Sequence, residues 1–295
     1  MTPGEKGFLL LSSTLGNPER KPLSSAQLRT LSQRATLMPR PKEDRDLEMT
    51  DLLALGYDEA MARRILALLY EEDLLEYYLR RSVRAGCVPI TRVSDDYPAR
   101  LRQRLGEESP GVLWAKGDAS ILTRPCVALV GSRDIRPENR RFAREAGRQA
   151  AQQGYVLISG NARGSDRMAQ DACLAAGGQV ISVVADELEK QPVRENVLYL
   201  SEEGFDSPFT SPRALSRNRV IHALGEKTLV AQCSLAAGGT WSGTVQNLRH
   251  GWSPVFCFRD GSKASVQLEN LGASPVSIED LADLKALQSG NLRLF

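Results

Sequence analysis

The sequence predicts an α/β protein in which a doubly wound, mostly parallel sheet follows a small helical segment. The first observation is a series of apolar runs of strand length, near residues 126–130, 155–159, 179–184, 228–232 and 254–258. The second is that helical patterns alternate with these runs, over Pro137–Gln153, Asp166–Ala176, Arg194–Glu203, Arg213–Leu224 and Trp241–Arg249. This alternation is typical of parallel strands joined by right-handed helical crossovers.

The N-terminal part is expected to form a helical domain over residues 1–88. Leucine and isoleucine recur there at helical spacing, most clearly from Asp58 to Arg84, with Glu and Arg on the other face. The α/β domain is expected over residues 89–270, with Leu113–Gly117 as a short edge strand near its start. Residues 271–295 are expected to be a short C-terminal tail, in which Ile278–Leu287 is patterned like one helix.

Composition narrows the possible classes of function. The 295 residues include 38 Lys and Arg against 36 Asp and Glu. This charge balance neither requires nor excludes binding to nucleic acid. No apolar stretch approaches the roughly 18 residues of a membrane span, so we expect a cytoplasmic protein with no membrane partner. The five cysteines form no CxxC pair and the chain has two histidines, so neither disulfides nor a metal site is expected.

Two loops that follow strand-like runs combine small residues with an arginine. The first contains Gly131, Ser132 and Arg133. The candidate residues of the second are Ser159, Gly160, Arg163 and Gly164. Small residues let backbone N–H groups approach an anion, and a guanidinium matches a pair of phosphate oxygens. Because both loops follow the carboxyl ends of predicted parallel strands, we expect them to share one phosphate-binding crevice.

Two later segments carry similar residues. Arg217, Asn218 and Arg219 precede the run at 228–232, and the two arginines either reach the crevice or pair with acidic neighbours. Gly238, Gly239 and Thr240 form a glycine loop before a helix, where amides and a hydroxyl can hold a phosphate. Trp241 is open to two interpretations, stacking on a base or packing in the core.

These four loops lack the residues of a catalytic centre. No paired carboxylates, no Cys/His couple and no P-loop lysine accompany them. They predict a binding site with no catalytic residue, no metal and no cofactor, and therefore a protein that is not an enzyme.

The order of the motifs resembles that of the DprA/Smf family of bacterial DNA-processing proteins. The resemblance rests on the four loops together with Asp96-Tyr97-Pro98, Leu113–Gly117 and Pro254-Val255-Phe256. It implies an extended Rossmann-like fold that binds single-stranded DNA, protects it and loads a RecA-type recombinase during natural transformation. It also implies that Arg133 contacts DNA phosphate and that the second loop and the Arg-Asn-Arg segment belong to the same site.

The chain departs from the family pattern after the third core run. Ala185-Asp186-Glu187 and Gln191-Pro192-Val193 replace a glycine-rich stretch and a Tyr-Pro-Lys segment. A lysine that the resemblance expects at the DNA is therefore missing, and Lys190 and Arg194 are the nearby substitutes. The sequence leaves the oligomeric state open, with a homodimer among the states that it allows.

Three hypotheses about function follow. The first is a non-catalytic protein that binds single-stranded DNA in DNA processing, uptake and recombination. The second is a sensor of a small nucleotide-derived ligand held in the same pocket. The third is an enzyme similar to the phosphoribohydrolases that share a Gly-Gly-x-Gly-Thr loop. It ranks lowest, because Val245, Gln246 and Asn247 follow the loop where those enzymes have a catalytic glutamate.

Overall fold

The computed structural model describes residues 1–37 and 46–288. Within them the chain forms a nine-stranded sheet in the order β1-β2-β6-β5-β4-β3-β7-β8-β9. The strands are β1 (Val88–Thr91), β2 (Val112–Lys116), β3 (Cys126–Val130), β4 (Val156–Ser159), β5 (Val180–Val183), β6 (Val197–Ser201), β7 (Lys227–Val230), β8 (Val255–Phe258) and β9 (Ser274–Val276). All neighbours pair in parallel except β1 with β2 and β2 with β6. The predicted α/β fold with a mostly parallel sheet is confirmed.

The strand order reverses beside β3. From β3 the chain builds outward through β4, β5 and β6, and it then returns to the other side of β3 with β7, β8 and β9. In doubly wound folds ligands bind outside the carboxyl ends of the strands at such a reversal. The ends of β3 and β7 are therefore the place to look for a site.

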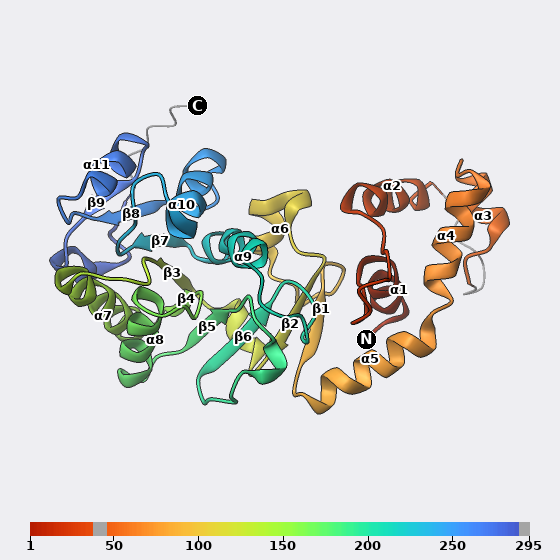
Figure 1. Ribbon diagram of the computed structural model, residues 1–295, viewed down its shortest axis with the longest axis horizontal. Coiled ribbons are helices and arrows are strands. Elements are labelled where there is room, and N and C mark those ends of the chain that lie inside the picture. The colour runs from red at the N-terminus through yellow and green to blue at the C-terminus, as the bar shows by residue number, and fades with distance from the viewer. Residues whose placement is uncertain (38–45, 289–295) are drawn as a thin grey trace.

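Helices cover both faces of the sheet (Figure 1). One face carries α7 (Pro137–Gln152) and α8 (Ser165–Ala175), and the other carries α6 (Ala99–Leu105), α9 (Ser211–Leu224), α10 (Gly238–His250) and α11 (Lys263–Asn270). Side chains alternate along β3, with Val127 and Leu129 in the core under α7 and Ala128 and Val130 in the core under α9. A strand buried on both faces has to be apolar throughout, as these residues are.

The N-terminal part is helical, as the leucine spacing predicts. Its helices are α1 (Pro3–Ser12), α2 (Ser25–Ala35), α3 (Met49–Ala54), α4 (Glu59–Leu69) and α5 (Glu72–Arg84). They lie beyond the β1 end of the sheet (Figure 1). The rings of Tyr78 on α5, Trp114 on β2 and Phe205 pack with centroids 4.8–5.4 Å apart, so this helical part shares a core with the sheet.

Several predicted elements differ from the structure. The helix predicted over Arg194–Glu203 is wrong, because this segment contains β6, which is buried between β5 and β2. In a short apolar run, hydrophobic periodicity cannot distinguish a buried strand from a helix. The edge-strand prediction for Leu113–Gly117 is also wrong, because β2 lies inside the sheet and β1, which was not predicted, forms the edge.

The C-terminal segment contributes to the α/β fold. β9 pairs with β8, and the short helix expected over Ile278–Leu287 is a 3-10 helix, η4 (Glu279–Asp283). The last residues of the expected tail, 289–295, lie outside the described residues. In the described part of the chain, no helix has the length and apolar character to cross a bilayer. No group of three or more His, Cys, Asp or Glu there is placed to hold a metal ion.

Candidate functional site

A pocket of about 670 Å³ opens where the strand order reverses, at the carboxyl ends of β3 and β7. The predicted site residues that line it are Gly131, Ser132, Arg133, Arg217, Asn218, Gly238, Gly239 and Thr240. The second loop contributes Ala162 and Asp166 to the same wall. Segments that are more than a hundred residues apart in the chain therefore meet around one crevice.

The first two loops are locked against each other. Gly131 has no room for a side chain, since a Cβ there would lie 2.5 Å from the Cβ of Ser165. Gly164 adopts a φ of +91°, and a Cβ there would lie 2.5 Å from the carbonyl oxygen of Ser132. That same carbonyl oxygen accepts a hydrogen bond from Ser165 Oγ at 3.0 Å. This close contact fixes the backbone from which the exposed side chain of Arg133 extends.

Asp166 organises the second loop from inside. Its carboxylate accepts hydrogen bonds from the N–H groups of Gly160 at 3.1 Å and Ala162 at 3.3 Å. Burial raises the pKa of Asp166, while the positive charge of Arg217 and these two hydrogen bonds act in the opposite direction. The buried carboxylate therefore depends on Arg217 for its compensating charge.

Arg217 is the buried cation of the pocket. It is 8% exposed, and its guanidinium lies directly over Gly160, where a Cβ would overlap it. Its Nε is buried and has no hydrogen-bond partner among the described residues. Burial lowers the pKa of Arg217 and the Arg133 charge adds to this effect, whereas Asp166 opposes it. A buried arginine with an unpaired donor beside a second arginine favours an anionic ligand.

The first turn of α10 lies at the same pocket. Its N-cap residue, Ala237, makes no side-chain cap, so the first N–H groups of the helix are not capped by it. Asn218 Nδ2 donates to the carbonyl oxygen of Gly239 at 3.1 Å and thereby ties this turn to α9. Gly238, Gly239 and Thr240 of this turn line the pocket, where the positive end of a helix dipole and N–H groups without a partner inside the helix are found.

Other predicted site residues lie elsewhere. Ser159 is fully buried and its hydroxyl accepts a hydrogen bond from Gln170 at 2.6 Å. Arg163 is exposed outside the pocket lining. Arg219 forms an ion pair with Glu202 at 2.8 Å and donates to the carbonyl oxygen of Glu108, beside a different hollow. Of the two arginines in the Arg-Asn-Arg segment, one lines the pocket and the other pairs with an acid.

The pocket also contains residues that sequence reasoning missed. Phe209 and Leu215 are half-exposed apolar residues of its lining, and no motif pointed to them. Trp241 lies outside that lining and packs, partly buried, against the core under α9 and α10. His222 lines the pocket from α9, and no motif of the sequence pointed to it.

Exposed arginines extend the positive surface beyond the pocket. Arg140 and Arg144 lie in the first half of α7, and Arg163 and Arg167 lie around the start of α8. The two helices pack closely, since a Cβ on Gly147 of α7 would lie 2.9 Å from the carbonyl carbon of Ala169 on α8. None of these four arginines forms an ion pair with another described residue.

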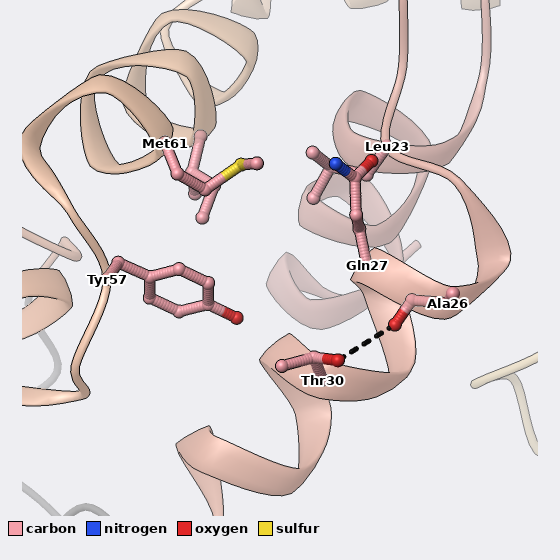
Figure 2. Close-up of a pocket in the computed structure, with 7 residues that line it drawn as sticks. Leu23, Ala26, Gln27, Thr30, Tyr57 and Met61 are labelled. Carbon is pink, nitrogen blue, oxygen red and sulfur yellow. Dashed lines mark hydrogen bonds between the residues drawn. The ribbon is translucent and has the colours of Figure 1, made fainter.

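The helical part has a hollow of a different kind. Figure 2 shows this pocket of about 170 Å³, in which Met61 and Tyr57 face Leu23 and Gln27. No arginine or lysine is among its lining residues. It therefore has none of the chemistry of an anion site, in contrast to the pocket at β3 and β7.

A protein-family model matches most of the α/β part of the chain. The model for DNA recombination-mediator protein A matches residues 89–283. The DNA processing protein DprA of Bacillus subtilis is 30% identical over 159 residues, which cover 49% of this chain and 51% of that protein. Protein Smf of Escherichia coli is 29% identical over 156 residues, which cover 49% of this chain and 41% of that protein. The chain thus spans about half the length of the curated relatives that it matches.

Two solved structures show the fold. DprA from Streptococcus pneumoniae superposes with a TM-score of 0.72 at 23% identity, covering 95% of this chain and 98% of that one. DNA processing protein A from Helicobacter pylori, described for its mode of binding single-stranded DNA, gives a TM-score of 0.56 at 22% identity. That superposition covers 66% of this chain and 94% of the Helicobacter pylori chain. At these identities the likeness supports the extended Rossmann-like architecture and says nothing about the ligand.

Proposed function

This chain belongs to the DNA recombination-mediator protein A family, and from that premise we propose that it binds single-stranded DNA in the pocket at β3 and β7. The observation that carries the proposal is the meeting of Arg133, Arg217 and the uncapped first turn of α10 around one crevice. In our proposal the two guanidinium groups and the α10 amides hold backbone phosphates. Phe209 and Leu215 supply apolar surface for a base.

We propose binding without catalysis. Asp134 and Asp166 are the carboxylates among the residues that line the pocket. Asp166 is occupied by two backbone N–H groups and by the nearby charge of Arg217, and Asp134 is on an exposed loop. We therefore propose that Asp166 holds the loop in place and takes no part in general acid–base chemistry. In the proposed role the protein covers single strands and passes them to a RecA-type recombinase, and neither step needs a cofactor.

Fluorescence anisotropy with a short labelled oligothymidylate tests the proposal. Each arginine makes a charge-assisted phosphate contact, so Arg133→Ala with Arg217→Ala should weaken binding by about 100-fold. The slope of log affinity against log salt should fall by about 1.4, because each single-strand phosphate contact contributes about 0.7. Arg133→Ala alone also tests the site. The side chain of Arg133 is exposed, so its removal should not disturb the buried Asp166.

The matched control removes two exposed arginines from the helical part, Arg63 and Arg80, which changes the net charge equally. This control should bind like the parent. Parental affinity in the Arg133/Arg217 variant, with melting curves that show a folded protein, would contradict the site assignment.

A small nucleotide is the second candidate ligand. The pocket volume of about 670 Å³ lies within the range of about 300–1,000 Å³ that is usual for small-molecule sites. Thermal-shift measurements separate the two functions. Stabilisation by an oligonucleotide and not by a mononucleotide supports DNA binding, and the reverse result supports a nucleotide sensor.

A further inference from the structure

A histidine lines the pocket that the proposed phosphate contacts do not use. His222 lies on α9, five residues beyond Arg217, and has no solvent exposure. Its Nε2 is buried and lacks a hydrogen-bond partner among the described residues. Buried polar atoms nearly always have a partner in folded proteins, because leaving one unpaired is costly. An unpaired nitrogen on a residue that lines a pocket points to a partner supplied by the ligand.

The hydrogen bonds behind the ring determine which nitrogen carries the proton. The backbone N–H of Ser253 donates to Asn247 Oδ1 at 2.8 Å, which identifies Nδ2 as the other end of that amide. Asn247 Nδ2 lies 3.2 Å from His222 Nδ1, and an amide nitrogen can only donate. His222 Nδ1 is therefore the acceptor, and the Thr228 hydroxyl, also 3.2 Å away, is compatible with this assignment. In the neutral ring the hydrogen is then on Nε2, which is a donor.

The ring is held in its neutral form. Burial, and next the positive charge of Arg217, lower the pKa of His222 to about 3. A proton on Nδ1 would also face the donating amide of Asn247. The Nε2–H group is thus a neutral donor in a fixed orientation, unlike the charged guanidinium groups nearer the rim.

A glycine of α10 lies close to this donor. Gly243 lies one turn inside α10, and a Cβ there would be 3.2 Å from His222 Nε2 and 3.1 Å from the Cβ of Asn218. Any side chain at residue 243 would cover the nitrogen. Asn218 holds the neighbouring turn of α10 through the Gly239 carbonyl, so this glycine lies close to the turn that lines the pocket.

We propose that His222 Nε2–H donates a hydrogen bond to an acceptor oxygen of the nucleotide that occupies the pocket. This inference rests on the proposed function and adds a contact to the same site. Two oxygens of a nucleotide fit the chemistry: a phosphate oxygen and a carbonyl oxygen of the base. A neutral donor suits either one, and the experiment distinguishes them.

Nuclear magnetic resonance of the imidazole N–H groups tests the inference directly. The chain contains two histidines, so isotopic labelling of histidine ring nitrogens reports on His222 and His250 alone. His250 is exposed, stacks on Trp252 with ring centroids 5.3 Å apart and lines a different hollow, which makes it the internal control. We expect the His222 Nε2–H signal to move on saturation with oligothymidylate and the His250 signal to stay.

An oligonucleotide of abasic sites provides the second arm. A shift of His222 with both ligands assigns the contact to a phosphate oxygen, and a shift with oligothymidylate alone assigns it to a base carbonyl. Anisotropy on the same samples reports binding separately. Saturated binding with an unmoved His222, or equal shifts of both histidines, would overturn this inference and leave the proposed function standing. Absence of any binding would overturn both.

A variant gives an independent check without replacing the histidine or its hydrogen-bond partners. Gly243→Ala places a methyl group beside Nε2 and should weaken oligonucleotide binding about fivefold, the factor expected for one lost hydrogen bond. Gly7→Ala in α1 is the matched helical control, since the nearest atom to its new Cβ is 4.0 Å away. If Gly243→Ala binds as tightly as the parent, the contact with His222 is not made.

Discussion

The guanidinium of Arg217 lies against the backbone of Gly160, in the space where any other residue would place its Cβ. Arg217 is on α9 and Gly160 follows β4, so the contact joins a helix to a loop 57 residues earlier in the chain. The contact brings a buried positive charge next to the N–H groups that Asp166 holds. It is the central packing relationship of the site.

The first prediction concerns Gly160→Ala. The new methyl group overlaps the Arg217 guanidinium, which is 8% exposed and has little room to withdraw. We expect oligonucleotide affinity to fall at least about tenfold and stability to fall by about 1–3 kcal/mol, as in other overpacked interiors. Gly4→Ala in α1, whose Cβ meets nothing closer than 4.0 Å, should leave affinity unchanged. Equal affinities of the parent and Gly160→Ala would refute the proposed role of the contact.

The second prediction separates Arg219 from Arg217. Arg219→Ala leaves the carboxylate of Glu202, whose side chain is 6% exposed, without its ion-pair partner. Burial already raises the pKa of Glu202 and the Arg219 charge opposes that rise. We expect a stability loss of about 1–3 kcal/mol in urea unfolding, with little change in DNA affinity at a temperature where the protein is folded. Adding Glu202→Gln should recover part of the loss, and a large affinity loss would place Arg219 in the DNA site instead.

The third prediction is a dependence of stability on pH. The pKa of His222 is lowered from 6.5 to about 3, so between these values the unfolded chain binds a proton at this residue that the folded protein does not. Stability should therefore fall as the pH falls below about 6.5, by up to about 1.4 kcal/mol per pH unit from this group. His222→Gln should reduce the slope in urea titrations. His250→Gln, at an exposed residue, should keep the parental slope, and identical slopes in all three proteins would exclude the effect.

The fourth prediction concerns the exposed arginines of α7 and α8 and the binding of longer DNA strands. Arg140, Arg144 and Arg167 are exposed and form no ion pair with another described residue, and they belong to the helices that follow the two loops of the pocket. Replacing all three with Gln should leave the affinity for a short oligonucleotide unchanged and weaken the binding of longer strands. The salt slope for long strands should drop by about 2, at about 0.7 per phosphate. The corresponding change at Arg63, Arg80 and Arg84 is the control, and equal losses in both triple variants would argue against a path over α7 and α8.

Most strands and the loops that follow them could be predicted from short segments. Cys126–Val130 and Val156–Ser159 are apolar because both faces of each strand are buried, and a small residue marks where each strand ends. These signals are local, so they required no knowledge of neighbouring strands. The order of the elements along the chain then favoured a doubly wound sheet, and the reversal beside β3 agrees with it.

Elements that depend on distant partners were not predicted. β6 is a strand because β5 pairs with it on one side and β2 on the other, although its sequence fits a helix equally well. β1 has four residues and pairs only with β2 among the described strands. In such short segments the hydrogen-bonding partner, which is far away in sequence, decides the secondary structure.

In the Arg-Asn-Arg segment, too, local sequence predicts the helix, whereas tertiary packing decides where each side chain points. Residue order alone was enough to predict a helix carrying Arg217 and Arg219 beside glycine loops, since charge and turn chemistry are properties of neighbouring residues. The two arginines are separated by about 200° around that helix, so they cannot face one pocket together. Burial of Val220, Ile221 and Leu224 against the sheet sets the rotation of α9. That packing turns Arg217 toward the crevice and Arg219 toward Glu202, because a helix presents whichever face its apolar side chains leave free.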